Sequence, residues 1–156
     1  MFKSFFKFCL TLLFKNYIVT IMLTELLSGL WIGNHEDAHN KEFYKDNLIT
    51  IAINCTIDRS FCDIQNIKNV RVPVSPYNTT EDILHLQTNM DKIISFLRSN
   101  IDDHNILLFG YENYTIPSIV IGVYMKKVGE LPTHTIKDII LSKNKNVQIE
   151  HDFSIF

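Results

Sequence analysis

The chain has 156 residues, of which 46% are hydrophobic and 21% are charged, and its formal net charge is −2. This length allows one domain with a substantial core, and the composition is that of an ordinary globular protein. Nothing in the near-neutral charge suggests the basic stripe that a nucleic-acid-binding surface needs, so we expect no nucleic-acid partner.

Residues 1–23 are predicted to form a basic, amphipathic helix ahead of a single domain at residues 24–156. No acidic residue occurs before Glu25, and a helix places Lys3, Lys7 and Lys15 on one face, with large apolar residues around the rest. This pattern is typical of a helix that lies on a membrane surface, whereas the lysines interrupt any run long enough to span one. Two alternatives stay open: a helix that packs on the domain or on a partner, and a dispensable extension before a natural start at Met22.

The first half of the domain alternates predicted strands and helices. A short strand is expected over residues 26–34, followed by a helix over residues 35–46 with Asn34 as its N-cap. Residues 48–54 are β-rich and apolar enough to be buried on both faces of a sheet. Residues 70–74 form another short strand, in which Pro73 indicates a strand end or a sheet edge.

The second half is dominated by one long helix and one buried strand. Residues 81–99 are predicted to be helical because their apolar residues recur at helical spacing. Residues 106–109 are an apolar run typical of a buried strand. A polar turn over residues 110–115 leads to a helix over residues 116–127, where Pro117 suits the first turn, and a further helix is expected over residues 135–141. Strands alternating with helices favour an α/β sheet covered on both faces.

Four stretches, in this order and spacing, resemble the dual-specificity protein phosphatases, a branch of the cysteine-based phosphatases. They are Leu30-Trp31-Ile32-Gly33-Asn34 with Asp37-Ala38; residues 49–56; Val72-Pro73-Val74 with Asp82-Ile83; and residues 106–127. The resemblance covers roughly residues 26–143. It implies a central sheet flanked by helices, with a phosphate loop between the strand at 106–109 and the helix that follows.

The chemistry of that family requires a nucleophilic cysteine, an arginine that binds two phosphate oxygens, small loop residues and an aspartic acid on a neighbouring loop. Its signature is His-Cys, five residues, Arg, then Ser or Thr. Aligned without a gap, the resemblance places Phe109 at the histidine, Gly110 at the cysteine and Ile116 at the arginine. The resulting degenerate phosphate loop, called the 109–117 loop below, consists of Phe109, Gly110, Tyr111, Glu112, Asn113, Tyr114, Thr115, Ile116 and Pro117.

No other part of the chain replaces the missing groups. Its arginines are Arg59, Arg71 and Arg98, and no cysteine precedes any of them at the signature's spacing. The loop over residues 75–80 contains no carboxylate, and we expect Glu81 and Asp82 beyond it to stabilise a helix start.

The cysteines and histidines offer no alternative chemistry. Cys9, Cys55 and Cys62 are too scattered for a disulfide framework or a metal site, which indicates a reducing compartment. Cys55 is interpreted as a buried, unreactive strand residue. His35 and His39 have metal-like spacing, yet they are expected on a solvated helix face without a third ligand. We therefore expect no metal and no cofactor.

The sequence thus predicts a pseudophosphatase in the cytoplasm that acts as a binding or scaffold module. Tyr111, Asn113 and Tyr114 are expected to be what the loop presents, to a protein partner or to a second copy of the chain, although the tyrosines could instead fill the old pocket. Phosphate binding is not expected. The alternatives are a membrane-associated platform that uses residues 1–23 and an enzyme of divergent mechanism. The Asn-, Ile- and Lys-rich composition is that of an AT-rich genome, such as that of a large DNA virus or a parasite.

Overall fold

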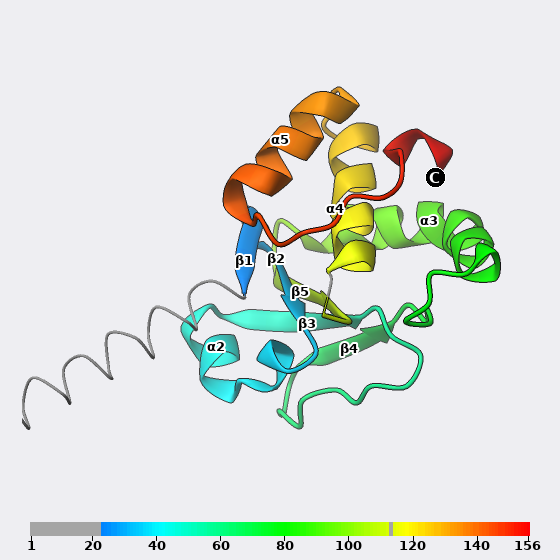
Figure 1. The fold of residues 1–156 in the computed structure, drawn as a ribbon. Helices are drawn as coiled ribbons and strands as arrows, with labels where there is room; N and C mark the ends of the chain where they lie inside the picture. Colours follow the sequence, from blue (N-terminus) through cyan, green and yellow to red (C-terminus); the bar gives the residue numbers. More distant parts are fainter. Residues whose placement is uncertain (1–22, 113) are drawn as a thin grey trace, which may run out of the picture.

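The computed structural model describes residues 23–112 and 114–156 (Figure 1). The helix predicted over residues 1–23 therefore lies outside the described residues, except for Leu23. The strands are β1 (Thr24–Leu27), β2 (Leu30–Asn34), β3 (Ile49–Asn54), β4 (Lys68–Arg71) and β5 (Asn105–Gly110). The helices are α2 (Lys41–Asp46), α3 (Thr80–Asn100), α4 (Thr115–Lys127) and α5 (Thr133–Lys143), with short 3-10 helices η1 (Asp37–His39) and η2 (Phe153–Ile155). Within the described part, no helix has the length and apolar character needed to cross a membrane.

The five strands form one sheet in the order β1-β2-β5-β3-β4, with β1 antiparallel to β2 and all other pairs parallel. The strand predicted at residues 106–109 is β5, at the centre of this sheet. Because β2, β3, β4 and β5 run in the same direction, the segments that follow them emerge at the same edge of the sheet. The ends of β2 and β5 lie in register there, with Asn34 beside Gly110.

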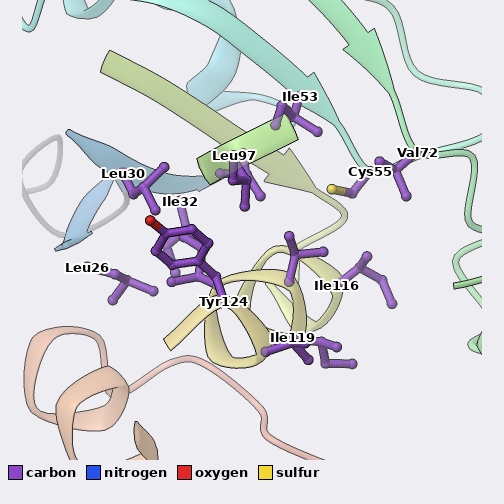
Figure 2. Close-up of a cluster of buried hydrophobic side chains, with 14 of the residues drawn as sticks. Leu26, Leu30, Ile32, Ile53, Cys55, Val72, Leu97, Ile116, Ile119 and Tyr124 are labelled. Atoms are coloured by element: carbon purple, nitrogen blue, oxygen red, sulfur yellow. The ribbon is translucent and has the colours of Figure 1, made fainter. Parts of the chain in front are cut away.

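Both faces of the sheet are covered, as predicted. Helices α3, α4 and α5 pack on one face, and α2 with the loop after β3 packs on the other (Figure 1). Each face of the sheet has its own hydrophobic cluster, and successive side chains of β5 point to opposite faces. Ile106 and Leu108 belong to the larger cluster, and Leu107 and Phe109 belong to the smaller one. Figure 2 shows the larger cluster, in which side chains from β1, β2, β3, α3 and α4 meet.

Two predictions near the start of the domain are wrong in detail. The single strand expected over residues 26–34 is a hairpin, because the chain turns at Gly29, whose φ of +76° is open to glycine at little cost. The single helix expected over residues 35–46 is interrupted at Asn40, which has an extended backbone and caps α2 by accepting a bond from Phe43 N. Asn34 does cap a turn as predicted, since its Oδ1 accepts from Asp37 N at 2.8 Å, but that turn is η1.

The remaining elements follow the predictions closely. Strand β3 begins one residue later than expected, because Leu48 has a φ of +51° and is 72% exposed in the turn after α2. Strand β4 lies at residues 68–71, earlier than the predicted 70–74, and ends before Pro73. Helix α3 buries Leu86, Met90, Ile94 and Leu97, which belong to the predicted apolar stripe.

The C-terminal tail closes the larger core. Phe153, in η2, is 1% exposed and lies against α4. A Cβ added at Gly122 of α4 would lie 2.4, 2.6 and 2.8 Å from three ring atoms of Phe153. Glycine is therefore needed inside this helix because the aromatic ring occupies the space where a side chain would be.

Candidate functional site

The candidate site is the 109–117 loop, which connects the central strand β5 to the buried helix α4. The Tyr114 N–H donates to the Tyr111 carbonyl at 3.2 Å, and the Tyr114 carbonyl accepts from Ser118 N at 3.1 Å and Ser118 Oγ at 2.7 Å. Tyr114 has a φ of +57°, a left-handed conformation that is strained for a residue with a side chain. The loop thus keeps a tight strand-to-helix connection, although Asn113 within it lies outside the described residues.

Gly110 stands where the resemblance expects the nucleophilic cysteine, and Pro117 closes the space beside it. A Cβ at position 110 would lie 3.0 Å from Cδ and 3.2 Å from Cγ of the Pro117 ring. Such distances are shorter than ordinary van der Waals contacts, and the proline ring is too stiff to move aside easily. The side chain that fits at position 110 therefore depends on the residue at position 117. A cysteine cannot be accommodated at position 110 without a shift of Pro117.

Ile116 stands where the resemblance expects the phosphate-binding arginine, and its side chain belongs to the core. It is 4% exposed and lies in the same hydrophobic cluster as Cys55 and Val72 (Figure 2). This position therefore directs a side chain into the apolar interior. A guanidinium here would be buried without a counter-charge, which is unfavourable.

The two tyrosines of the loop have different surroundings. Tyr114 is only 5% exposed, so the prediction that the loop presents it is wrong, and its ring instead fills the interior. Burial raises the pKa of its phenol, the charge of Asp37 raises it further, and a hydrogen bond with Asn34 acts in the opposite direction. Tyr111 is half-buried at the surface and is the tyrosine that the loop presents.

Tyr111 ties the 109–117 loop to the segment after β3. Its hydroxyl donates to Asp58 Oδ1 at 2.6 Å and accepts from the Ile57 N–H at 3.4 Å. Burial raises the pKa of Tyr111, and the bond to Asp58 adds to this shift. The same hydrogen bond lowers the pKa of Asp58. The two loops are therefore held together by a carboxylate that stays charged at neutral pH.

Arg59 lies beside Tyr111, a position that spacing along the sequence did not reveal. Its guanidinium carbon is 5.9 Å from the Tyr111 ring centroid. The Arg59 carbonyl accepts from Asn54 Nδ2 at 2.8 Å and from an Arg71 nitrogen at 2.9 Å, which fixes the segment. Asn54 and Thr56, both fully buried polar residues, hold this turn in a fixed geometry, since Thr56 Oγ1 donates to Asn54 Oδ1 and accepts from Arg59 N.

A small polar cavity of about 60 Å³ opens between these groups, lined by Asn34, His35, Glu36, Arg59, Tyr111 and Glu112. It has room for about two water molecules. The charges of Glu36 and Glu112 oppose that of Arg59. Burial lowers the pKa of His35, and the neighbouring His39 and Arg59 lower it further, so its imidazole is neutral. The cavity therefore does not have the excess positive charge that holds a phosphate dianion.

His35 and His39 do not form the solvated helical face that the sequence predicts. The segment is a turn followed by η1, both residues are half-buried, and their ring centroids are 4.4 Å apart. His39 Nδ1 lies 2.8 Å from the His35 carbonyl oxygen, and the His35 ring lies near Phe109. Among the described residues no group of three metal-ligating side chains occurs.

Asp82 acts as a helix cap, as predicted. Its carboxylate accepts from Ser75 N, Thr79 N and both hydroxyls, and Thr79 Oγ1 accepts from Asp82 N in return, which completes a capping box. Burial acts to raise the pKa of Asp82, but the hydrogen bonds from Ser75 and Thr79 outweigh it and lower the pKa to about 2. Asp82 is thus ionised at neutral pH, whereas a general acid must carry a proton.

Cys55 is a buried residue, as predicted. It is 0% exposed, and burial raises the pKa of its thiol to about 12. A nucleophilic cysteine requires the thiolate, which such a pKa disfavours by several orders of magnitude at neutral pH.

No protein-family model and no curated protein matches the sequence. Solved structures do match. The structure of DUSP15 has a TM-score of 0.74 at 21% identity and covers 86% of this chain and 83% of its own. Human DUSP28 has a TM-score of 0.68 at 15% identity, covering 85% and 87%. Human tyrosine phosphatase-like serine/threonine/tyrosine-interacting protein has a TM-score of 0.71 at 12% identity, covering 85% and 91%. These likenesses confirm the predicted fold, that of the dual-specificity phosphatases.

Proposed function

We propose that this chain is a catalytically inactive, dual-specificity-phosphatase-like protein that acts as a binding module. The observation that carries the proposal is the pair Gly110 and Ile116. The strand, loop and helix of the fold are present, yet the position of the nucleophile is occupied by a glycine against Pro117, and the position of the arginine by a core isoleucine. The thiol of Cys55 and the carboxylate of Asp82 are in the wrong protonation states to replace the missing groups.

The purified protein is expected to show no turnover of a generic aryl phosphate and no thermal stabilisation by phosphate or tungstate. Removing one enzymatic nucleophile alone can lower turnover by about a millionfold, and here the loop also lacks the arginine that would bind the anion. The measurements are phosphate release and a thermal shift, with sodium chloride at matched ionic strength as the control. Turnover would overturn the proposal of inactivity. Stabilisation by tungstate without turnover would instead support a phosphate-reading module.

We propose a binding surface at the C-terminal ends of the parallel strands β3, β4 and β5. Ile57 follows β3, Tyr77 follows β4 and Tyr111 follows β5, and these strands are adjacent and parallel. Ile57 is 58% exposed and Tyr77 is 82% exposed. Tyrosines and apolar residues exposed on neighbouring loops are typical of the core of a protein interface.

A photo-crosslinking amino acid at position 77 is therefore expected to give discrete adducts, either with a second copy in the purified protein or with a partner in extracts of the source cells. The matched control places the same group at Lys45, which is exposed on α2, just before the start of β3 rather than after its end. Adducts at position 77 and none at position 45 support this surface. Equal adducts at both positions, or none at either, contradict it.

A further inference from the structure

A second surface, separate from the 109–117 loop, lies where helix α3 passes the edge strand β4. A groove of about 410 Å³ opens there, floored by Ile53, Val70 and Val72 and walled on the helix side by Ile93 and Phe96. This volume is in the range of ligand and peptide sites. The floor and wall are apolar, and Val70, Ile93 and Phe96 are only partly buried by the rest of the chain. The groove thus leaves apolar surface open to solvent.

The groove has a cationic rim. Lys92 lies on the α3 side and is exposed, and Lys68 on β4 places its Nζ 4.7 Å from the Phe96 ring centroid. No carboxylate lines the groove. Within the described residues, neither Lys68 nor Lys92 has a carboxylate within salt-bridge distance, since the ion pairs there are Arg59 with Asp58 and Lys127 with Asp91. Lys68 and Lys92 are therefore available to pair with a carboxylate from another molecule.

The backbone of β4 also presents N–H and C=O groups beside the groove that are unpaired among the described residues. In the described sheet β4 is the last strand, paired only with β3. The Val72 N–H donates to the Asn54 carbonyl at 2.9 Å, so by alternation along the strand the N–H and C=O groups of Asn69 and Arg71 point away from β3. An added strand could pair with these groups while it places alternate side chains in the groove.

We propose that this groove binds an extended, acidic and apolar peptide segment of a partner protein by strand addition to β4. The apolar side chains of such a segment fill the space between Val70 and Phe96, and its carboxylates face Lys68 and Lys92. Charge complementarity excludes the chain's own first residues as the occupant, because they carry Lys3, Lys7 and Lys15 and no acidic residue. The proposal goes beyond the inactive loop, since it involves other residues and holds whether or not that loop binds anything.

The test measures fluorescence anisotropy with a labelled peptide of alternating leucine and glutamate, and with a twin in which lysine replaces glutamate. The acidic peptide should bind the full-length chain and the lysine twin should not. Lys92→Glu should weaken binding of the acidic peptide about tenfold, whereas Lys45→Glu on α2 should leave it unchanged. Both lysines are exposed, so both variants should fold, which circular dichroism checks.

A third peptide tests the strand pairing. N-methylation of alternate backbone nitrogens in the acidic peptide removes donors without changing its charge, and should abolish binding. Equal binding of the N-methylated peptide would overturn strand addition. Equal binding of the lysine twin, no effect of Lys92→Glu, or no binding of the acidic peptide would overturn the proposal, and Lys68 would then serve to protect an exposed strand edge.

Discussion

An Ile116→Arg substitution, which restores the arginine of the phosphatase signature, is expected to lower the free energy of unfolding by about 3–5 kcal/mol, the usual cost of a buried charge without a partner. It is also expected to confer no tungstate binding, because the side chain at position 116 points into the hydrophobic cluster with Cys55 and Val72. Urea unfolding followed by circular dichroism measures the first effect, and a thermal shift with tungstate measures the second.

Ile116→Val is the matched control, with an expected loss of about 0.5–1.5 kcal/mol. An arginine variant that stays within about 1 kcal/mol of the parent chain and is stabilised by tungstate would show that the loop can still direct this side chain to an anion. The addition of Gly110→Cys and Pro117→Ser, which removes the ring 3.0 Å from the new Cβ, should still give no turnover, because the loop over residues 75–80 carries no carboxylate and Asp82 beyond it is ionised.

Phe153→Ala is expected to cost about 3–5 kcal/mol of stability, as large core truncations do. The ring is 1% exposed and fills the space above Gly122, so its removal leaves a cavity between the C-terminal tail and α4. Urea denaturation should show a lower midpoint with little change in the slope. Ile155→Ala, at a neighbouring residue that is 46% exposed, should change stability by less than about 1 kcal/mol.

A double-mutant cycle tests the contact itself. Gly122→Ala alone should be destabilising, because its Cβ would lie within 2.4 Å of the Phe153 ring, but it should be much less harmful in the Phe153→Ala background. Additive effects of the two substitutions would mean that Phe153 and Gly122 do not contact each other in solution.

Tight packing around the 109–117 loop maintains the strand-to-helix connection. Gly110 fits against Pro117, Ile116 fits the core and Tyr114 fills the interior, so each departure from the phosphatase signature is matched by a neighbour. These contacts stabilise the strand-to-helix connection with no anion bound. The two surfaces that we propose for binding, the loops around Tyr111 and the groove beside β4, both lie outside this packed interior.

The sequence by itself determined the elements whose pattern is local. The apolar run of β5, the helical spacing of Leu86, Met90, Ile94 and Leu97 in α3, and the proline in the first turn of α4 are all readable from neighbouring residues. The order of these elements was enough to predict the fold, and residue identity at positions 110 and 116 is the basis of the proposal that the chain is inactive.

The tertiary structure alone decided which residues meet. Arg59 reaches the 109–117 loop from the segment after β3, and Phe153 reaches Gly122 from the end of the chain. It also decided that Tyr114 is buried while Tyr111 is presented. The physical reason is that periodicity and capping depend on residues a few positions apart, whereas burial and side-chain contacts depend on the parallel packing of strands that are far apart in the chain.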